Sequence, residues 1–306
     1  MTAAQIPIET HERLPADDIE QVLALAGRAE AADQVGPLSE HAHLHLHRGG
    51  GPDLVSRTPQ GQVAGYAHID GADGELVVDP DQRRHGHGRA LVAELERITG
   101  SNGPRVWAHG NLPAAVAMAA ALGYQKVREL WQMQRPLSGP NTEPLPDPKP
   151  LDGLRLRAFR PGEDEDAWLS VNARAFAHHP EQGGWTATDL VEREASDWFD
   201  PEGLLLAVDD DQGGAVAGFH WTKEHREPGA EPVGEVYVLA VDPAYQGRGL
   251  GPALTLAGLQ HLRSRGLSTV MLYVDGDNAP AIATYRRLGF ERVALDVMYA
   301  RSRTGD

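Results

Sequence analysis

The stretch that decides the fold is residues 235–251, which read EVYVLAVDPAYQGRGLG. Its first seven residues predict a buried strand, and the residues that follow Gly251 have helical periodicity. Between them, glycines at alternate positions allow backbone N–H groups to converge at a helix N-terminus, where the helix dipole favours an anion. The stretch therefore predicts a strand, a phosphate-binding loop and a helix. For a single loop of this kind, a glycine-rich turn without a ligand is the alternative.

The same pattern occurs a second time in the chain. Residues 76–88 read LVVDPDQRRHGHG and match LAVDPAYQGRGLG at 239–251, with an offset of 163. Further along, ALGY at 121–124 matches RLGF at 287–290, with an offset of 166. Two loops in register after matching strands favour a functional loop over a turn. We therefore expect two copies of one fold.

A proline-rich stretch separates the copies. Six prolines fall between positions 136 and 150, where they forbid helix and favour an extended linker. We expect a first domain at 1–137, a linker at 138–152 and a second domain at 153–306. The order of elements predicts an α/β fold, in which each domain has a mixed central sheet flanked by helices. In the second copy, Asn278 is expected to cap a helix that Gly289 stops.

Composition limits the classes of function. The chain has 28 Lys and Arg against 44 Asp and Glu, a balance that disfavours nucleic acids and anionic membranes as partners. The absence of cysteine excludes disulfides, thiolate metal ligands and a cysteine nucleophile. No apolar run is long enough to span a membrane and the N-terminus does not resemble a signal peptide, so we expect a cytoplasmic protein. We also expect a monomer. Histidines at 41, 43, 45 and 47 lie on two faces of a helix, so no metal site is expected.

The loop Gln/Arg-x-x-Gly-x-Gly after a strand and before a helix resembles motif A of the GNAT N-acetyltransferases, where it binds the pyrophosphate of acetyl-CoA. Further stretches extend the resemblance over nearly the whole chain: HPEQGGW (179–185), DWFDPEG (197–203), GFHWTK (218–223), GEVYVLAVDP (234–243) and WAHG (107–110). They are similar to a tandem-domain member of the family. That resemblance implies acetyl-CoA as cosubstrate, no metal, and the cysteinyl amine of a glucosaminyl-inositol as acceptor. The alternatives are another N-acetyltransferase of a small amine, aminoglycoside or peptide, and a non-catalytic acyl-CoA-binding module.

Acetyl transfer to an amine needs a base for the ammonium, an acid for the leaving thiolate and an N–H donor for the oxyanion. Glu235 can be the base and Tyr285 the acid, and the resemblance implies the same roles. Taken alone, Glu235 also fits a solvated carboxylate and Tyr285 a core tyrosine. Offsets of 163 and 166 place Ala72 and Ala119 at the equivalent positions. The first copy is therefore expected to bind acetyl-CoA without transferring its acetyl group.

The binding residues follow from the loops, the capped helix and the resemblance. In the second copy, acetyl-CoA contacts are expected at Leu239, Ala240, Val241, Gln246, Gly247, Arg248, Gly249, Leu250, Gly251, Pro252, Asn278, Ala279, Pro280, Ala281, Ile282 and Ala283. In the first copy they are expected at Leu76, Val77, Val78, Arg84, His85, Gly86, His87, Gly88 and Arg89. For the acceptor, the resemblance implies Glu40, Glu181, Lys223, Glu235 and Tyr273, with a cleft that both halves share.

Overall fold

The computed structural model describes residues 6–301, except 50, 141, 148–150, 152, 179, 227 and 228. Contacts divide the chain into two units. Of the described residues, the first unit holds 6–131, 275–277 and 294–301, and the second holds the rest up to 293. The boundary passes through two strands, β6 (Tyr124–Pro136) and β12 (Glu291–Arg301), so each of them supplies residues to both units. A single cut in the sequence does not separate the units.

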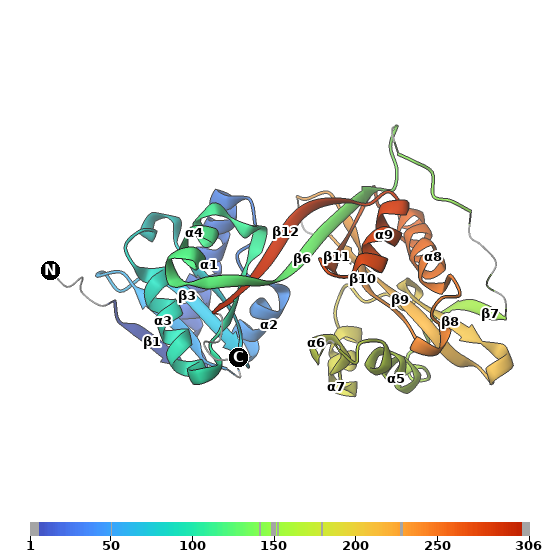
Figure 1. The fold of residues 1–306 in the computed structure, drawn as a ribbon, viewed down its shortest axis with the longest axis horizontal. Coiled ribbons are helices and arrows are strands. Elements are labelled where there is room, and N and C mark those ends of the chain that lie inside the picture. Colours follow the sequence, from blue (N-terminus) through green and yellow to red (C-terminus); the bar gives the residue numbers. More distant parts are fainter. Residues whose placement is uncertain are drawn as a thin grey trace. The chain divides into compact units, whose positions relative to one another are not determined.

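The first unit is a mixed sheet with helices on both faces (Figure 1). Its strands follow the order β1-β2-β3-β4-β5-β12, antiparallel except for the parallel pair β4 and β5. Its elements besides β6 and β12 are β1 (Ile8–His11), α1 (Ala16–Asp33), α2 (Glu40–Arg48), β2 (Asp53–Arg57), β3 (Val63–Asp70), β4 (Asp73–Val78), η1 (Pro80–Gln82), α3 (His87–Thr99), η2 (Gly100–Asn102), β5 (Arg105–Ala108), η3 (His109–Asn111) and α4 (Pro113–Leu122).

The second unit repeats this plan in the order β6-β11-β10-β9-β8-β7. Again one internal pair, β10 with β11, is parallel. Its further elements are β7 (Leu154–Ala158), α5 (Glu165–Ala175), α6 (Pro180–Gly183), α7 (Ala187–Glu194), η4 (Pro201–Gly203), β8 (Leu204–Asp209), η5 (Asp210–Gln212), β9 (Ala215–His225), β10 (Val233–Val241), η6 (Pro243–Tyr245), α8 (Leu250–Ser264), β11 (Thr269–Asp275) and α9 (Ala279–Arg287).

Alternation along β9 shows how the sheet of the second unit is covered. Phe219 and Trp221 point to one face and pack against Trp168 of α5. His220, between them, points to the other face, where its Nδ1 lies 2.8 Å from the carbonyl oxygen of Leu254 in α8. Figure 1 shows α5, α6 and α7 on the first of these faces and α8 on the second. An apolar core therefore holds both faces of the sheet in place.

The predicted fold class, two α/β units with mixed sheets, is confirmed. The strand predicted at 235–241 and the helix predicted after Gly251 are present as β10 and α8. The predicted capped helix is α9, whose cap Asn278 accepts a hydrogen bond from the N–H of Ala281 at 3.2 Å. The sequence reading missed α7, although Thr186 and Asp189 form a capping box there, a pattern that sequence alone can reveal. In the described part of the chain, no helix is long and apolar enough to cross a membrane.

Candidate active site

The two parallel strands of the second unit separate at the centre of the sheet. The register of β10 with β11 ends at the pair Val236 and Leu272, although β10 continues to Val241 and β11 to Asp275. A β-bulge at Tyr237 interrupts the pairing of β10 with β9 at the same level. Beyond it, the backbone of Leu239 faces the gap on the β11 side, so its polar groups can bind a ligand that enters between the strands.

The predicted phosphate loop follows β10. Gly247 has φ +78° and Gly249, the N-cap of α8, has φ +80°, a conformation that glycine adopts without strain. Asp242 anchors the loop, because its Oδ1 accepts from the N–H of Ala244 at 2.9 Å and its Oδ2 lies 2.6 Å from Nη2 of Arg174 in α5. The first amides of α8 are thereby held at a fixed place, as an anion site requires.

The predicted cofactor residues divide by burial. Ala240, Leu250 and Ile282 are buried in the core, so they can offer a ligand only their backbone. The side chain of Asn278 is used as the cap of α9. Arg248 lies with its guanidinium carbon 5.2 Å from the centroid of the Tyr245 ring, beside the loop. The remaining predicted residues of the second copy lie on the loop, at the start of α8 or in the first turns of α9, at exposed or half-buried positions: Gln246, Gly251, Pro252, Ala279, Pro280, Ala281 and Ala283.

Glu235 lies just before the point where the strands separate. It is only 7% exposed, and its Oε2 lies 2.7 Å from Nε2 of His225 on β9. The register places Lys223 directly opposite Glu235, and the ammonium of Lys223 lies 4.6 Å from the ring centroid of Trp198. Sequence reasoning missed His225, although its place two residues after Lys223 puts both on one face of β9. Glu235 is therefore a buried carboxylate whose imidazole partner reaches the surface, since the His225 side chain is 30% exposed.

Tyr285 and Tyr273 differ in environment. Tyr285 on α9 is 8% exposed, and its ring meets that of Phe290 edge-on with centroids 5.6 Å apart. Burial raises the pKa of Tyr285 to about 12, so its hydroxyl keeps its proton at neutral pH and can donate it. Tyr273 is 45% exposed. It follows Met271, the β11 partner of Glu235, by two residues, so Tyr273 lies on the same face of the sheet as Glu235.

Two predicted acceptor residues lie elsewhere. Glu181 is in the short helix α6, and its side chain is outside the described part of the structure. Glu40 begins α2 in the first unit, is exposed, and follows the cap Ser39, whose N–H donates to Oε2 of Glu75 at 2.7 Å. The cleft shared by both halves stays a prediction.

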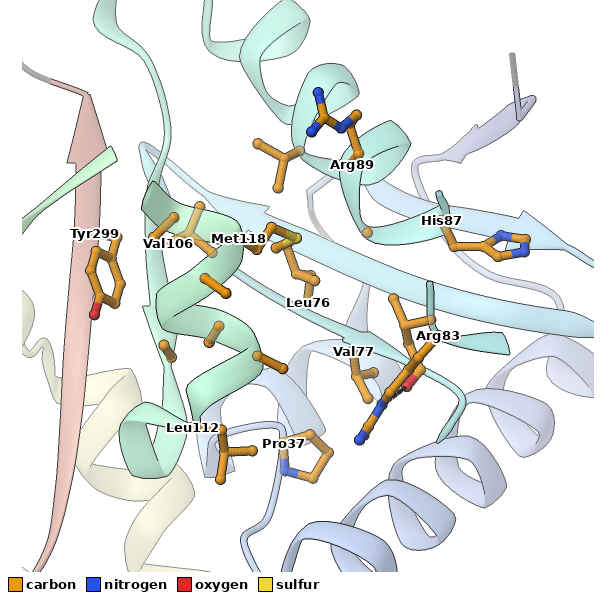
Figure 2. Close-up of a pocket in the computed structure, with 18 of the residues that line it drawn as sticks. Pro37, Leu76, Val77, Arg83, His87, Arg89, Val106, Leu112, Met118 and Tyr299 are labelled. Atoms are coloured by element: carbon orange, nitrogen blue, oxygen red, sulfur yellow. Dashed lines mark hydrogen bonds between the residues drawn. The ribbon is translucent and has the colours of Figure 1, made fainter. Parts of the chain in front are cut away.

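The first unit contains a cavity of about 880 Å³ at the place that corresponds to the gap between β10 and β11 (Figure 2). Here the register of β4 with β5 ends at the pair Gly74 and Val106, while β4 continues to Val78. All the predicted cofactor residues of this copy line the cavity except His85, which lies on the loop: Leu76, Val77, Val78, Arg84, Gly86, His87, Gly88 and Arg89.

The strand registers correct the alignment of the two copies at the base. In β10, Glu235 pairs with Lys223 and Met271; in β4, the residue with the equivalent two partners is Asp73, which pairs with Asp70 and Arg105. The predicted equivalence with Ala72 is wrong, because the bulge at Tyr237 adds one residue to β10 that β4 lacks. Asp73 forms an ion pair with Arg105, so the first copy keeps a carboxylate but neutralises it.

A buried charged group in the first unit was not predicted. His109 lies between Glu75, with Nε2 to Oε2 3.4 Å, and Asp296, with Nδ1 to Oδ2 3.1 Å. Burial opposes the charge on the imidazole, but the hydrogen bonds and charges of Asp296 and Glu75 outweigh it and raise the pKa of His109 to about 10. His109 in turn lowers the pKa of Glu75 to about 2 against the effect of burial. Glu75 lies on β4, His109 directly follows β5 and Asp296 lies on β12, so these contacts connect the three strands.

Two clusters have the residue types of a metal site. Among the described residues, Asp200, Glu224 and His261 are close enough to share an ion. However, Nε of Arg265 lies 2.9 Å from Oε1 of Glu224 and its Nη2 lies 3.9 Å from Asp200, so a cation is already present. In the histidine run, which forms α2, the side chain of His45 is 9% exposed and stacks on His68 with ring centroids 5.0 Å apart. His45 therefore packs against the rest of the first unit and is largely shielded from solvent.

Comparison with known proteins gives consistent relatives. The model of the acetyltransferase (GNAT) family matches residues 24–124 and 168–290. A mycothiol acetyltransferase of Thermomonospora curvata is 55% identical, over 92% of this chain and 93% of its own length. Others of that name, from Salinispora arenicola and Geodermatophilus obscurus, are 51% and 49% identical and cover 95% and 99% of this chain, and 95% and 100% of their own lengths.

Solved structures agree on the fold. A GCN5-related N-acetyltransferase from Sphaerobacter thermophilus has a TM-score of 0.69 at 25% identity and covers 97% of this chain and 96% of its own. A tandem GNAT protein from the clavulanic acid biosynthesis pathway has a TM-score of 0.70 at 22% identity, with 98% of this chain and 100% of its own covered. The second match shows the fold alone, and it shows that fold twice in one chain.

Proposed function

The chain belongs to the GNAT acetyltransferase family, and on this premise we propose that it is a mycothiol acetyltransferase. It would transfer the acetyl group of acetyl-CoA to the cysteinyl amine of 1D-myo-inositol 2-(L-cysteinylamino)-2-deoxy-α-D-glucopyranoside, the last step of mycothiol biosynthesis. The observation that carries the proposal is that relatives of this name are about half identical to the chain over nearly its whole length. We propose further that it acts in the cytoplasm as a monomer and uses no metal.

The second unit is the proposed catalytic one, because it alone combines the loop with both proton-transfer groups. Glu235 accepts the proton that the acceptor amine loses as its nitrogen bonds to the acetyl carbon. His225, bonded to the same carboxylate at 2.7 Å and partly exposed, holds Glu235 in place and connects it to solvent. A carboxylate held in this way has few orientations, so little rearrangement precedes the proton transfer.

Acetyl-CoA supplies the activated thioester, and its narrow arm is proposed to enter between β10 and β11, whose pairing ends at Val236 and Leu272. The backbone N–H groups near Leu239 are proposed to bind the developing oxyanion, while the loop and the N-terminus of α8 bind the pyrophosphate. Tyr285 donates its proton to the sulfur as the carbon–sulfur bond breaks. With no cysteine in the chain to accept the acetyl group, direct attack by the amine is the simplest route.

Acceptor binding is proposed for Lys223 and Tyr273 together with Glu40 and Glu181. Lys223 is buried beside aromatic rings next to Glu235, so it offers a fixed donor to a hydroxyl of the sugar or the inositol. Tyr273, which is 45% exposed, lies on the same face. Carboxylates at positions 40 and 181 suit a polyhydroxylated ligand with one cation. The first unit is proposed to bind acetyl-CoA through its own loop and the start of α3, residues 83–89, without catalysing transfer.

The test is an assay of the purified chain with acetyl-CoA and the cysteinyl pseudodisaccharide, in which mass spectrometry follows the acetylated product and free CoA. We expect turnover, none with the acceptor that lacks its cysteine, and little with aminoglycosides. Glu235→Gln should lower kcat by about 10²- to 10⁴-fold. Glu231→Gln, an exposed carboxylate on the loop before β10, is the matched control and should keep the rate. Turnover of an aminoglycoside alone would refute the substrate assignment, and an unchanged rate in Glu235→Gln would refute the base.

A further inference from the structure

The two units differ at the helix that follows the second strand of each parallel pair, which is α4 in the first unit and α9 in the second. In the second unit, the Tyr285 ring fills the space beside Phe290. In the first unit, α4 carries Ala119 at the equivalent position, and Tyr124 stands where Phe290 does. This alignment rests on the glycine that ends each helix, Gly123 with φ +74° and Gly289 with φ +81°. The first unit therefore has room for roughly a phenol ring that the second unit lacks.

The cavity of the first unit extends into this room. Val92, Val106, Ala119, Tyr124 and Tyr299 line it there, and Figure 2 shows α4 between Tyr299 and Leu76. The helix contributes mostly methyl groups, because the residues of α4 that line the cavity include Ala114, Ala115, Ala117, Ala119 and Ala121.

The two tyrosines at this end offer ring surface, since their hydroxyls are already used. The Tyr124 hydroxyl donates to Glu96 at 2.9 Å, and the Tyr299 hydroxyl donates to Asn111 at 2.8 Å. This end of the cavity therefore favours an apolar occupant.

The other end of the cavity is cationic. Arg83 is held by Asp33, with Nη2 to Oδ2 2.6 Å. Arg84 on the same loop and Arg89 in the first turn of α3 are exposed and form no ion pair among the described residues. Gly86, with φ +101°, begins α3 and directs its first amides to this end. A ligand that satisfies both ends has an anionic diphosphate head, a narrow arm and an apolar tail.

We propose that the first unit binds an acyl-CoA whose acyl chain is longer than acetyl, and holds it without transfer. The proposal deepens the proposed function, because it takes the loop as a CoA site. Transfer is excluded by the residues at the two proton positions, since Asp73 is paired with Arg105 and Ala119 has no proton to give. The second unit, with Tyr285 in the corresponding space, is limited to the short acetyl group.

Calorimetric titration of the full chain with acetyl-CoA, butyryl-CoA and hexanoyl-CoA, without acceptor, tests the proposal. One site should bind more tightly as the chain grows, by about fourfold for each methylene that becomes buried. Ala119→Tyr restores the missing ring and should lower the affinity of that site for hexanoyl-CoA at least tenfold, while its affinity for acetyl-CoA changes little. Ala120→Tyr, on the same helix but exposed and outside the cavity lining, is the matched control and should behave as the unmodified chain.

Equal affinities for acetyl-CoA and hexanoyl-CoA in the unmodified chain, or an unchanged hexanoyl-CoA affinity in Ala119→Tyr, would overturn the proposal. If thermal melting shows that Ala119→Tyr does not fold, amide hydrogen exchange of the unmodified chain tests the proposal instead. Residues 113–122 should then be protected more by hexanoyl-CoA than by acetyl-CoA, and equal protection overturns the proposal. Acetyl turnover is measured on the same preparations. Its absence beside an intact chain-length preference refutes only the proposed function.

Discussion

At the scale of single residues, we propose that Glu235 and His225 divide the handling of a proton between a buried and a partly exposed side chain. The carboxylate is 7% exposed, and its hydrogen bond to the imidazole spans 2.7 Å. On this proposal each residue depends on the other, because His225 orients the carboxylate of Glu235 and Glu235 passes its proton to His225. This coupling distinguishes a positioning residue from a merely neighbouring one.

A double-mutant cycle tests this coupling. We expect His225→Gln to lower kcat about tenfold with KM for acetyl-CoA unchanged, since the loop and the gap are untouched. In the Glu235→Gln background, the same change should cost almost nothing further, because the partner is already absent. Steady-state kinetics of the four proteins measure it. Additive losses would show that His225 acts independently of Glu235.

Tyr285 supports a second prediction at this scale. Its pKa of about 12 keeps the hydroxyl protonated through the neutral range, so Tyr285→Phe removes a proton donor and nothing else at that pH. We expect kcat to fall about 10²-fold. The melting temperature should change little, because the ring keeps its edge-on contact with Phe290. A variant with full kcat would identify Tyr285 as a core tyrosine only.

At the scale of elements, α8 closely approaches β9 at Gly258 and His220. His220 is fully buried, and burial lowers its pKa to about 4, so the ring is neutral at pH 7. A Cβ at Gly258 would lie 2.1 Å from that ring. The close approach places the N-terminus of α8, and with it the phosphate loop, over the sheet.

Gly258→Ala should therefore destabilise the chain by about 1–3 kcal/mol, since ring and helix must move apart. His220→Ala removes the obstacle, so Gly258→Ala should cost much less in that background. Urea unfolding of the four proteins measures the free energies. If the cost of Gly258→Ala is the same with and without His220, the ring is not the cause.

The group formed by Glu75, His109 and Asp296 gives a pH dependence. The folded pKa of His109 is about 10 against 6.5, so its stabilisation is complete below pH 6.5 and is lost as pH rises through 10. Glu75 has a folded pKa of about 2 against 4.5, so its part is present above pH 4.5 and is lost as pH falls through 2. The first unit should thus be most stable between about pH 4.5 and 6.5.

We expect the melting temperature to fall between about pH 6.5 and 10, and His109→Gln to remove most of that slope. The variant should also be less stable overall, by about 3–5 kcal/mol, because it leaves two buried carboxylates without their cation. Thermal melts at several pH values measure both effects. A slope that persists unchanged in His109→Gln would assign it to other groups.

Some of this architecture follows from sequence and some does not. Asn278 and the glycines of the two loops act locally, so their cap and turns could be predicted from neighbouring residues. The bulge at Tyr237 is a property of strand pairing, and without it the offset of 163 led to Ala72 instead of Asp73. The contact of His109 with Asp296 joins residues 187 positions apart. Such a contact leaves no periodic signal in the sequence.

At the scale of the whole molecule, the chain carries two loops of one kind and one set of proposed proton-transfer groups. Valine at either helix N-cap, Gly249 or Gly86, would force a β-branched residue to positive φ, at a cost of about 1–2 kcal/mol, and shift the first amides. We expect Gly249→Val to raise KM for acetyl-CoA at least tenfold. Gly86→Val should instead remove one bound equivalent of acyl-CoA. Steady-state kinetics measure KM, and equilibrium dialysis counts the bound equivalents of acyl-CoA. A rise in KM confined to Gly86→Val would mean that the first unit is the catalytic one.

Because residues 294–301 belong to the first unit, that unit can complete its sheet only late in synthesis on the ribosome. The pairing of β5 with β12, at Val297 with Ala108, forms only after the intervening second unit has been synthesised. Until then β5 has an open edge, which is a site for misassociation of nascent chains. Tyr299, from the same strand, also lines the cavity of the first unit. A ligand in that cavity would therefore contact a side chain that the ribosome adds only after the second unit has been synthesised.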